Sequence, residues 1–243
     1  MDEKVLKKGF EQEQNIQSGM MSTDVLLITG KRGTGKTFFG KYYIKTFLLD
    51  KIKTVVFDPL WQYGDLGKVT HNINDIKRVK DKGLIIYEPI SEIDTPEHFD
   101  ELAHMVFEMG NCVFVAEEVN EYIGDYQNTP KFRRLIRRGR NRGIGVICTS
   151  QRPKYLSTNF IAAVDHWFIF RQDLKVDLDR IFEYLERANP DYNQDFVAAL
   201  PNFHYLHKYV EKKTGKNIVI ACKPVKDTAK AKIITKPEEL FEF

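Results

Sequence analysis

The sequence has little of what marks secreted, membrane-spanning or metal-binding proteins. It contains only three cysteines, Cys112, Cys148 and Cys222, without a CxxC pair, which argues against a disulfide scaffold and indicates a reduced, intracellular protein. No apolar run approaches the ~20 residues that cross a bilayer. The first ten residues, MDEKVLKKGF, lack the apolar core of a signal peptide. We therefore expect a soluble protein without a direct membrane span.

A large excess of charge of one sign is missing as well. The formal net charge is +3, with 42% hydrophobic and 29% charged residues, so a role with nucleic acid would depend on where the charge sits. A chain of 243 residues is long enough to bury one large α/β core. We expect a polar extension over residues 1–22 and a single domain over residues 23–243.

The strongest motif in the sequence is GKRGTGKT at residues 30–37, which lies between an apolar run and a helix-forming segment. Its glycines, Gly30, Gly33 and Gly35, allow backbone torsions that let successive N–H groups cradle a phosphate at a helix N-terminus. Lys36 brings positive charge to the β- and γ-phosphates, and the Thr37 hydroxyl is a ligand for Mg²⁺. The motif predicts binding of ATP with Mg²⁺, through Gly30, Lys31, Arg32, Gly33, Thr34, Gly35, Lys36 and Thr37.

Short apolar segments alternate with helical patterns along the rest of the chain. Strands are predicted at 54–57, 84–87, 112–116, 143–148 and 165–170. Helices are predicted at 38–49, 74–82, 96–109 with Thr95 as N-cap, 131–138, and from 174 to a point before Pro190. Asp191 is expected to cap a short helix that runs to Leu200, and segments 203–210 and 217–222 predict a β-hairpin. This pattern indicates an α/β fold with a mainly parallel central sheet, helices on both faces and a C-terminal antiparallel β-hairpin.

Two carboxylates, Glu117 and Glu118, follow the apolar segment 112–116 directly. Burying a pair of acids at the carboxyl end of a strand is costly unless a cation needs them. In a phosphate-loop NTPase this is the place of the Mg²⁺-associated acid and of the residue that activates water. We assign Glu117 to the metal and Glu118 to the general base. Because Glu replaces Asp at the metal position, the division of roles within the pair stays open.

Residues 131–142 read KFRRLIRRGRNR, with seven basic residues in twelve. An apolar stripe at helical spacing leaves the other faces to the arginines, and Gly139 is expected to stop the helix. The four helical arginines form either a solvated basic face or a contact for DNA phosphates; they are Arg133, Arg134, Arg137 and Arg138.

Two further arginines, Arg140 and Arg142, lie in the loop before the next predicted strand. There, one of them is placed to reach the γ-phosphate bound by an adjacent subunit, a role that raises turnover by ~10³–10⁵. Gln151 follows the end of the same strand, where an amide can sense the γ-phosphate or orient water. We therefore include Gln151, Arg140 and Arg142 with Glu118 and Lys36 among the catalytic residues.

GKRGTGKT, VFVAEE, RRGRNRGIGVICTSQRP and DHWFIFRQ together resemble the HerA/FtsK superfamily of DNA-translocating ATPases. More narrowly, the chain looks like the genome-packaging ATPases of membrane-containing, double jelly-roll viruses. The resemblance spans about residues 25–171 and implies a RecA-like core, a ring of six subunits with ATP between neighbours, and double-stranded DNA in the channel. It also implies a nucleotide contact for Arg171, capsid or internal-membrane proteins as partners, and action in the host cytoplasm and at the packaging vertex of the virion.

Other functions stay open at this point. A HerA-like DNA-processing ATPase or a plasmid-transfer ATPase would carry the same motifs. A small-molecule kinase would share the phosphate loop but needs an acceptor pocket and an arginine-bearing lid, whereas these arginines precede a core strand. An NTP-binding regulatory switch is disfavoured because the pair Glu117 and Glu118 is equipped for hydrolysis.

Overall fold

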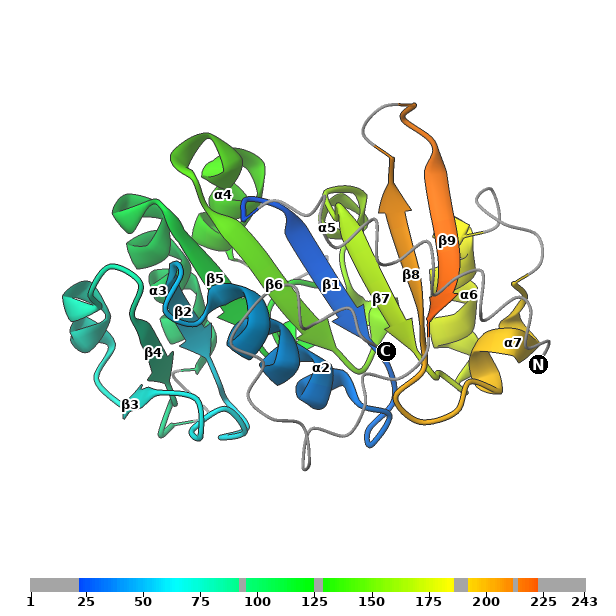
Figure 1. The fold of residues 1–243 in the computed structure, drawn as a ribbon, viewed down its shortest axis with the longest axis horizontal. Coiled ribbons are helices and arrows are strands. Elements are labelled where there is room, and N and C mark those ends of the chain that lie inside the picture. The colour runs from blue at the N-terminus through cyan, green and yellow to red at the C-terminus, as the bar shows by residue number, and fades with distance from the viewer. Residues whose placement is uncertain (1–21, 92–94, 125–128, 186–191, 212–213, 223–243) are drawn as a thin grey trace.

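A single sheet runs through the whole molecule (Figure 1). The computed structural model describes residues 22–91, 95–124, 129–185, 192–211 and 214–222, so the predicted extension over 1–22 lies outside the described residues except for Ser22. The nine strands follow the order β3-β4-β2-β5-β6-β1-β7-β8-β9. Every neighbouring pair from β3 to β7 is parallel, whereas β8 and β9 are added antiparallel. This topology confirms the predicted α/β fold with its C-terminal hairpin.

The strands are β1 (Val25–Thr29), β2 (Lys53–Phe57), β3 (Lys68–Thr70), β4 (Leu84–Tyr87), β5 (Cys112–Ala116), β6 (Gly145–Ser150), β7 (His166–Phe170), β8 (Tyr205–Val210) and β9 (Asn217–Cys222). The α-helices are α2 (Lys36–Tyr43), α3 (Thr95–Met109), α4 (Pro130–Arg138), α5 (Thr158–Ala162), α6 (Lys175–Leu185) and α7 (Gln194–Ala198). Shorter turns of helix are the π-helical η1 (Ile44–Leu48) and the 3-10 helices η2 (Ile73–Arg78), η3 (Val119–Glu121), η4 (Gly139–Arg142) and η5 (Pro153–Tyr155).

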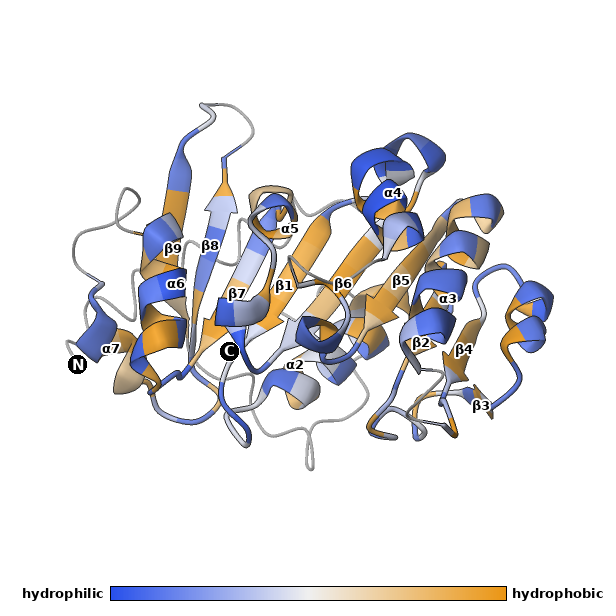
Figure 2. Cartoon of the chain, turned by 180° about the vertical axis from the view of Figure 1, so that it is seen from behind, coloured by the Kyte–Doolittle hydropathy of each residue, from blue (hydrophilic) through white to orange (hydrophobic). Residues whose placement is uncertain are grey.

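Helices cover both faces of this sheet, as predicted. In Figure 1, α2 lies in front of the central strands, and α3 to α6 lie behind them. Every residue of β1, β5 and β7 is buried, which explains why these segments read as continuous apolar runs rather than as alternating patterns. Figure 2 shows the same contrast, with hydrophobic central strands and a largely hydrophilic α4. Among the described helices, none is long and apolar enough to cross a membrane.

Several predicted boundaries differ from the structure. The first helix begins at Lys36, inside the phosphate-binding motif, and continues as η1. The helix predicted over 74–82 is a 3-10 helix that ends at Arg78. Helix α4 ends at Arg138 with Gly139 as its C-cap, as predicted, but Gly139 has a helical φ of −61° and the 3-10 turn η4 follows it. The left-handed residue is Gly143, with φ of 69°, at the end of η4. The local sequence indicates that a helix is present more reliably than it indicates the residue at which the helix begins or ends.

Further differences concern the shortest elements. The predictions did not include β3 or α5, which have only three and five residues. The cap of α7 is Asn193, whose side chain accepts a hydrogen bond from the Phe196 N–H at 2.9 Å. The predicted cap, Asp191, lies outside the described residues.

The carboxyl ends of the parallel strands position the predicted site. Thr29, at the end of β1, is in register with Ser150 of β6 and Ile169 of β7. The end of β5 aligns in turn with β6, through Ala116 and Cys148. Segments that follow these four strands therefore meet at one edge of the sheet, although they are far apart along the chain.

Candidate nucleotide-hydrolysis site

The phosphate-binding loop is anchored to both neighbours of β1. The Gly30 N–H donates to the carbonyl of Ser150 at 3.2 Å, and the Lys31 N–H donates to the carbonyl of Arg171 at 2.9 Å. The Lys31 ammonium also pairs with Asp173; this contact, with the Arg171 guanidinium further away, lowers the pKa of that carboxyl. The structure thus brings the predicted residue Arg171 to the loop through its backbone.

The three glycines of the loop serve two different purposes. Gly33 and Gly35 have φ of 80° and 114°, in the left-handed region, as the torsion argument predicts. Gly30 does not have a positive φ. A Cβ there would lie 2.5 Å from Cβ of Phe170 and 2.8 Å from Oγ1 of Thr34. Gly30 is therefore required for space rather than for an unusual torsion.

Lys36 is buried at the first position of α2, with 5% of its surface exposed. Its ammonium lies 3.4 Å from the carbonyl of Lys31, across the loop. Burial lowers the pKa of Lys36, and the carboxylates of Glu118 and Glu117 oppose that shift. The lysine thus lies between the loop and the predicted acids, as a phosphate contact requires. Of the other loop residues, Arg32 is exposed and Thr34 is buried, with its hydroxyl donating to the Lys31 carbonyl at 2.7 Å.

Thr37 and Glu117 offer the two oxygen ligands predicted for Mg²⁺. The Thr37 hydroxyl lies 3.3 Å from Oε1 of Glu117 and donates to Oε1 of Gln62 at 2.8 Å. Glu117 is 1% exposed, and burial raises the pKa of its carboxyl to about 7. Hydroxyl and carboxylate oxygens are the hard donors that Mg²⁺ takes, and a divalent cation stabilises a buried carboxylate. The donor set therefore fits the ion.

A tyrosine that sequence reasoning did not find orients Glu117. Tyr63 is fully buried, and its hydroxyl donates to Oε2 of Glu117 at 2.8 Å. Burial, and secondly the charge of Glu117, keep the pKa of Tyr63 well above its usual range, so the hydroxyl remains a donor. The Tyr63 N–H in turn donates to Oδ2 of Asp58 at 2.6 Å. Gly40 leaves room for this arrangement, since a Cβ there would lie 2.7 Å from the Tyr63 hydroxyl.

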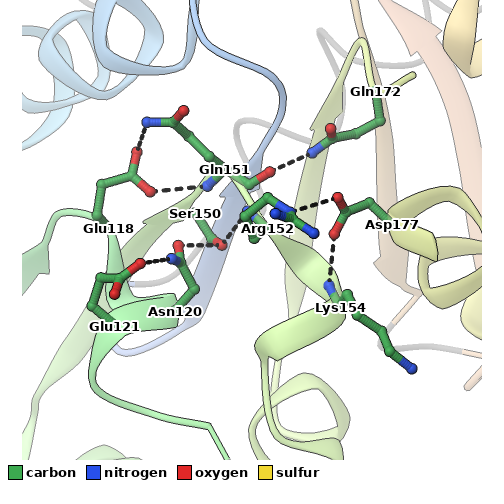
Figure 3. Close-up of polar contacts among 9 residues, drawn as sticks. All are labelled: Glu118, Asn120, Glu121, Ser150, Gln151, Arg152, Lys154, Gln172 and Asp177. Carbon is green, nitrogen blue, oxygen red and sulfur yellow. Dashed lines mark hydrogen bonds and ion pairs between the residues drawn. The ribbon is translucent and has the colours of Figure 1, made fainter. Parts of the chain in front are cut away.

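Gln151 holds both carboxylate oxygens of Glu118 (Figure 3). The Gln151 side-chain amide donates to Oε1 at 2.7 Å, and its backbone N–H donates to Oε2 at 3.0 Å. Glu118 itself has a left-handed backbone, with φ of 50°, and its N–H donates to the Thr149 hydroxyl at 3.0 Å. A strained torsion at this position is typical of functional sites. The two residues predicted as base and sensor are therefore direct partners.

Behind Gln151, polar contacts tie the end of β6 to α6 (Figure 3). The Gln172 amide donates to the carbonyl of Gln151 at 3.0 Å. Arg152 donates to the fully buried carboxylate of Asp177 at 2.8 Å. The Ser150 hydroxyl donates to Oδ1 of Asn120 at 2.8 Å. The segment that carries Gln151 is thus held on both sides by buried polar partners, which fix its position.

Arg140 and Arg142 precede β6 and lie at the opposite edge of the sheet from the phosphate loop of the same chain. Arg140 contacts both oxygens of Asp165 at 2.8 Å and keeps 55% of its side chain exposed. Arg142 donates to the carbonyl of Phe107 at 2.6 Å and to that of Glu108 at 2.9 Å. Arg142 therefore caps the C-terminus of α3, whereas Arg140 faces solvent.

The arginines of α4 differ in their surroundings. Arg134 lies 3.5 Å from a carboxylate oxygen of Glu108, and its guanidinium lies over the ring of Phe107, 4.0 Å from the centroid. Within the described part of the chain, Arg137 and Arg138 have no carboxylate within ion-pair distance, and both are exposed. The helix thus presents unneutralised positive charge at its C-terminal end.

Comparison with known proteins agrees with this geometry. No protein-family model matches the sequence. The chain is 27% identical to the DNA packaging ATPase P9 of Enterobacteria phage PRD1, with 82% of this chain and 86% of that protein covered. The chain is similar to a viral DNA packaging ATPase. This similarity confirms the resemblance that the sequence motifs indicated.

Solved structures support the same fold. The genome packaging NTPase B204 of Sulfolobus turreted icosahedral virus 2, in complex with AMPPCP, has a TM-score of 0.66 at 20% identity, covering 85% of this chain and all of that one. VirB4 of Thermoanaerobacter pseudethanolicus has a TM-score of 0.60 at 11% identity, covering 83% and 90%. The fold is therefore that of RecA-like, phosphate-loop ATPases, as expected from the motifs.

Sequence reasoning missed the residues of the site that come from loops. Tyr63 and Gln62 follow β2, and the only signal was Asp58, an acid at the end of that strand. Phe203 precedes β8, and its N–H donates to the carbonyl of Thr34 at 2.8 Å; no local pattern marks it. Such contacts join segments separated by tens to hundreds of residues, so they are visible only once the chain is folded.

Proposed function

We propose that this protein is an ATP-driven motor that moves double-stranded DNA into a viral capsid. The observation that carries the proposal is the assembly of Lys36, Thr37, Glu117 and the Glu118–Gln151 pair at one sheet edge, in a chain similar to a DNA packaging ATPase. Its partners would be double-stranded DNA and capsid or internal-membrane proteins, in the host cytoplasm and at the packaging vertex of the virion.

In this proposal each side chain acts on a different part of the triphosphate. Lys36 neutralises the β- and γ-phosphates, while the loop N–H groups and the start of α2 hold the phosphates in place. Thr37 and Glu117 hold Mg²⁺, which, when bound, offsets charge on the phosphates. Glu118 takes the proton of the attacking water. Each oxygen of Glu118 accepts one hydrogen bond from Gln151, which fixes the carboxylate and leaves a further acceptor site on each oxygen for the water proton.

We further propose that the site is completed by a neighbouring subunit in a ring, with six subunits as the family resemblance implies. We favour Arg140 of the two exposed arginines because its partner is the side chain of Asp165, which can exchange for a phosphate, whereas the Arg142 guanidinium is fixed by two backbone carbonyls at the end of α3. Arg140→Ala should abolish turnover, and mixing it with Lys36→Ala subunits should restore part of the activity. Arg142→Ala should lower thermal stability and leave turnover largely intact. Without rescue in the mixed rings, Arg140 would be structural only.

For DNA contact we propose the exposed end of α4. Arg137→Ala and Arg138→Ala should weaken DNA binding and flatten its salt dependence, because each lost phosphate contact removes about one unit from the slope of log K against log salt. The matched control is Arg134→Ala, whose guanidinium pairs with Glu108. If all three substitutions weaken DNA binding equally, the loss reflects the overall positive charge of the protein and not a defined contact between α4 and DNA.

The deciding experiment is ATP turnover with and without double-stranded DNA, combined with particle imaging in the presence of ATP. We expect DNA to stimulate turnover and rings to form, and Lys36→Ala to remove the turnover. A small-molecule kinase or a regulatory switch would remain indifferent to DNA. If DNA does not change the rate of ATP turnover and the protein stays monomeric with ATP, the proposal of a DNA-translocating motor is refuted.

A further inference from the structure

The aromatic side chain of Phe203 lies directly against the phosphate-binding loop. It comes from the turn between α7 and β8, and its N–H donates to the carbonyl of Thr34 at 2.8 Å. A Cβ on Gly35 would lie 2.7 Å from Cδ1 of the Phe203 ring. The ring also packs edge-to-face on Phe38, with centroids 5.6 Å apart. The turn is therefore fitted to the start of α2.

Two properties of Phe203 are not explained by packing. Its backbone is left-handed, with φ of 65°, a torsion that is unfavourable for a bulky residue and that concentrates at ligand-binding positions. The residue nevertheless remains 41% exposed. A residue that only supports the loop would gain from complete burial, whereas Phe203 stays partly accessible to solvent next to the loop.

The position of Phe203 relative to the acids indicates what it faces. In the sheet, Glu117, Glu118 and Gln151 follow β5 and β6 on one side of β1, whereas Phe203 precedes β8 on the other side, beyond β7. Thr37 and Glu117 mark the end of the site where Mg²⁺ and the γ-phosphate belong. A nucleotide held by the loop therefore extends its nucleoside end toward the side of Phe203.

We propose that Phe203 is a stacking platform for the nucleobase of the bound nucleoside triphosphate, an inference that rests on the proposed nucleotide site. Aromatic side chains bind bases through their π-faces with little preference for sequence or base type. The platform therefore contributes affinity, and it does not by itself select ATP over GTP. The left-handed turn presents the ring, and the packing on Phe38 fixes its orientation.

The test compares binding of ATP with binding of inorganic tripolyphosphate, which carries the phosphates but has no base. Phe203→Ala should weaken ATP binding about tenfold, a value within the range of base-aromatic stacking, and should leave tripolyphosphate binding within twofold. Phe203→Trp should retain ATP affinity, and its added fluorescence should be quenched by ATP and not by tripolyphosphate. The matched control is Phe47→Ala, which removes a half-buried ring from η1, the continuation of the same helix.

Equal weakening of both ligands by Phe203→Ala would overturn the inference and make the ring a support for the loop. Unchanged ATP affinity, or a Phe203→Trp signal that responds equally to both ligands, would overturn it too. Because the readout is binding, a protein that binds ATP without DNA-stimulated turnover would refute the motor and leave the base platform standing.

Discussion

Tyr63→Phe isolates a single hydrogen bond in the hydrolysis site. The change keeps the buried ring, which fills space between α2 and the sheet, and removes only the hydroxyl that donates to Glu117 at 2.8 Å. A hydrogen bond to a charged group contributes about 1.5–3 kcal/mol. Partners that orient a metal ligand change metal affinity by about 10–100-fold. These ranges agree, because 1.4 kcal/mol corresponds to about tenfold.

We therefore expect Tyr63→Phe to raise the Mg²⁺ concentration for half-maximal ATP turnover by about 10–100-fold at saturating ATP. The assay is initial ATP turnover against free Mg²⁺. The matched control is Tyr87→Phe, which removes another buried hydroxyl, 2.7 Å from Nδ1 of His98 on the opposite face of the sheet. That control should change stability and not the Mg²⁺ requirement. A Tyr63→Phe protein whose Mg²⁺ requirement stays within twofold would refute the role given to the hydroxyl.

Four further substitutions test other parts of the structure. Glu118→Gln should bind ATP normally and lose about 10²–10⁴ in single-turnover hydrolysis, as expected for a general base; rapid turnover would reassign the base. Gly35→Ala should abolish nucleotide binding because the added Cβ would clash with Phe203. Gly33→Ala has open space around the added Cβ, so it should lower the free energy of unfolding in urea by only about 1–2 kcal/mol, the cost of a left-handed torsion. Phe132→Ala empties a site that is 1% exposed and should destabilise the fold by about 3–5 kcal/mol; a loss below 1 kcal/mol would contradict its place in the core.

The elements that the sequence predicted well are strands in which most residues are buried. Strands β4, β5 and β9 have the predicted bounds, since burial within a sheet selects apolar and β-branched residues along most of each segment. Helix ends were less accurate. Gly139 ends α4 as predicted, but it is not left-handed; the chain continues as η4, and Gly143 is the left-handed residue. Composition cannot tell which of two nearby glycines takes that torsion.

The phosphate-binding loop and the acids after β5 are readable from the sequence because their chemistry depends on short spacing: glycines next to Lys36 and Thr37, and two carboxylates directly after a buried strand. The tertiary structure decided which partners these residues meet. Only the folded sheet sets Thr37 against Glu117, Glu118 against Gln151, and the turn at Phe203 against the loop. Parallel strands bring their carboxyl ends together whatever their distance along the chain, so the sequence determines the kind of chemistry and the sheet order determines the geometry of the site.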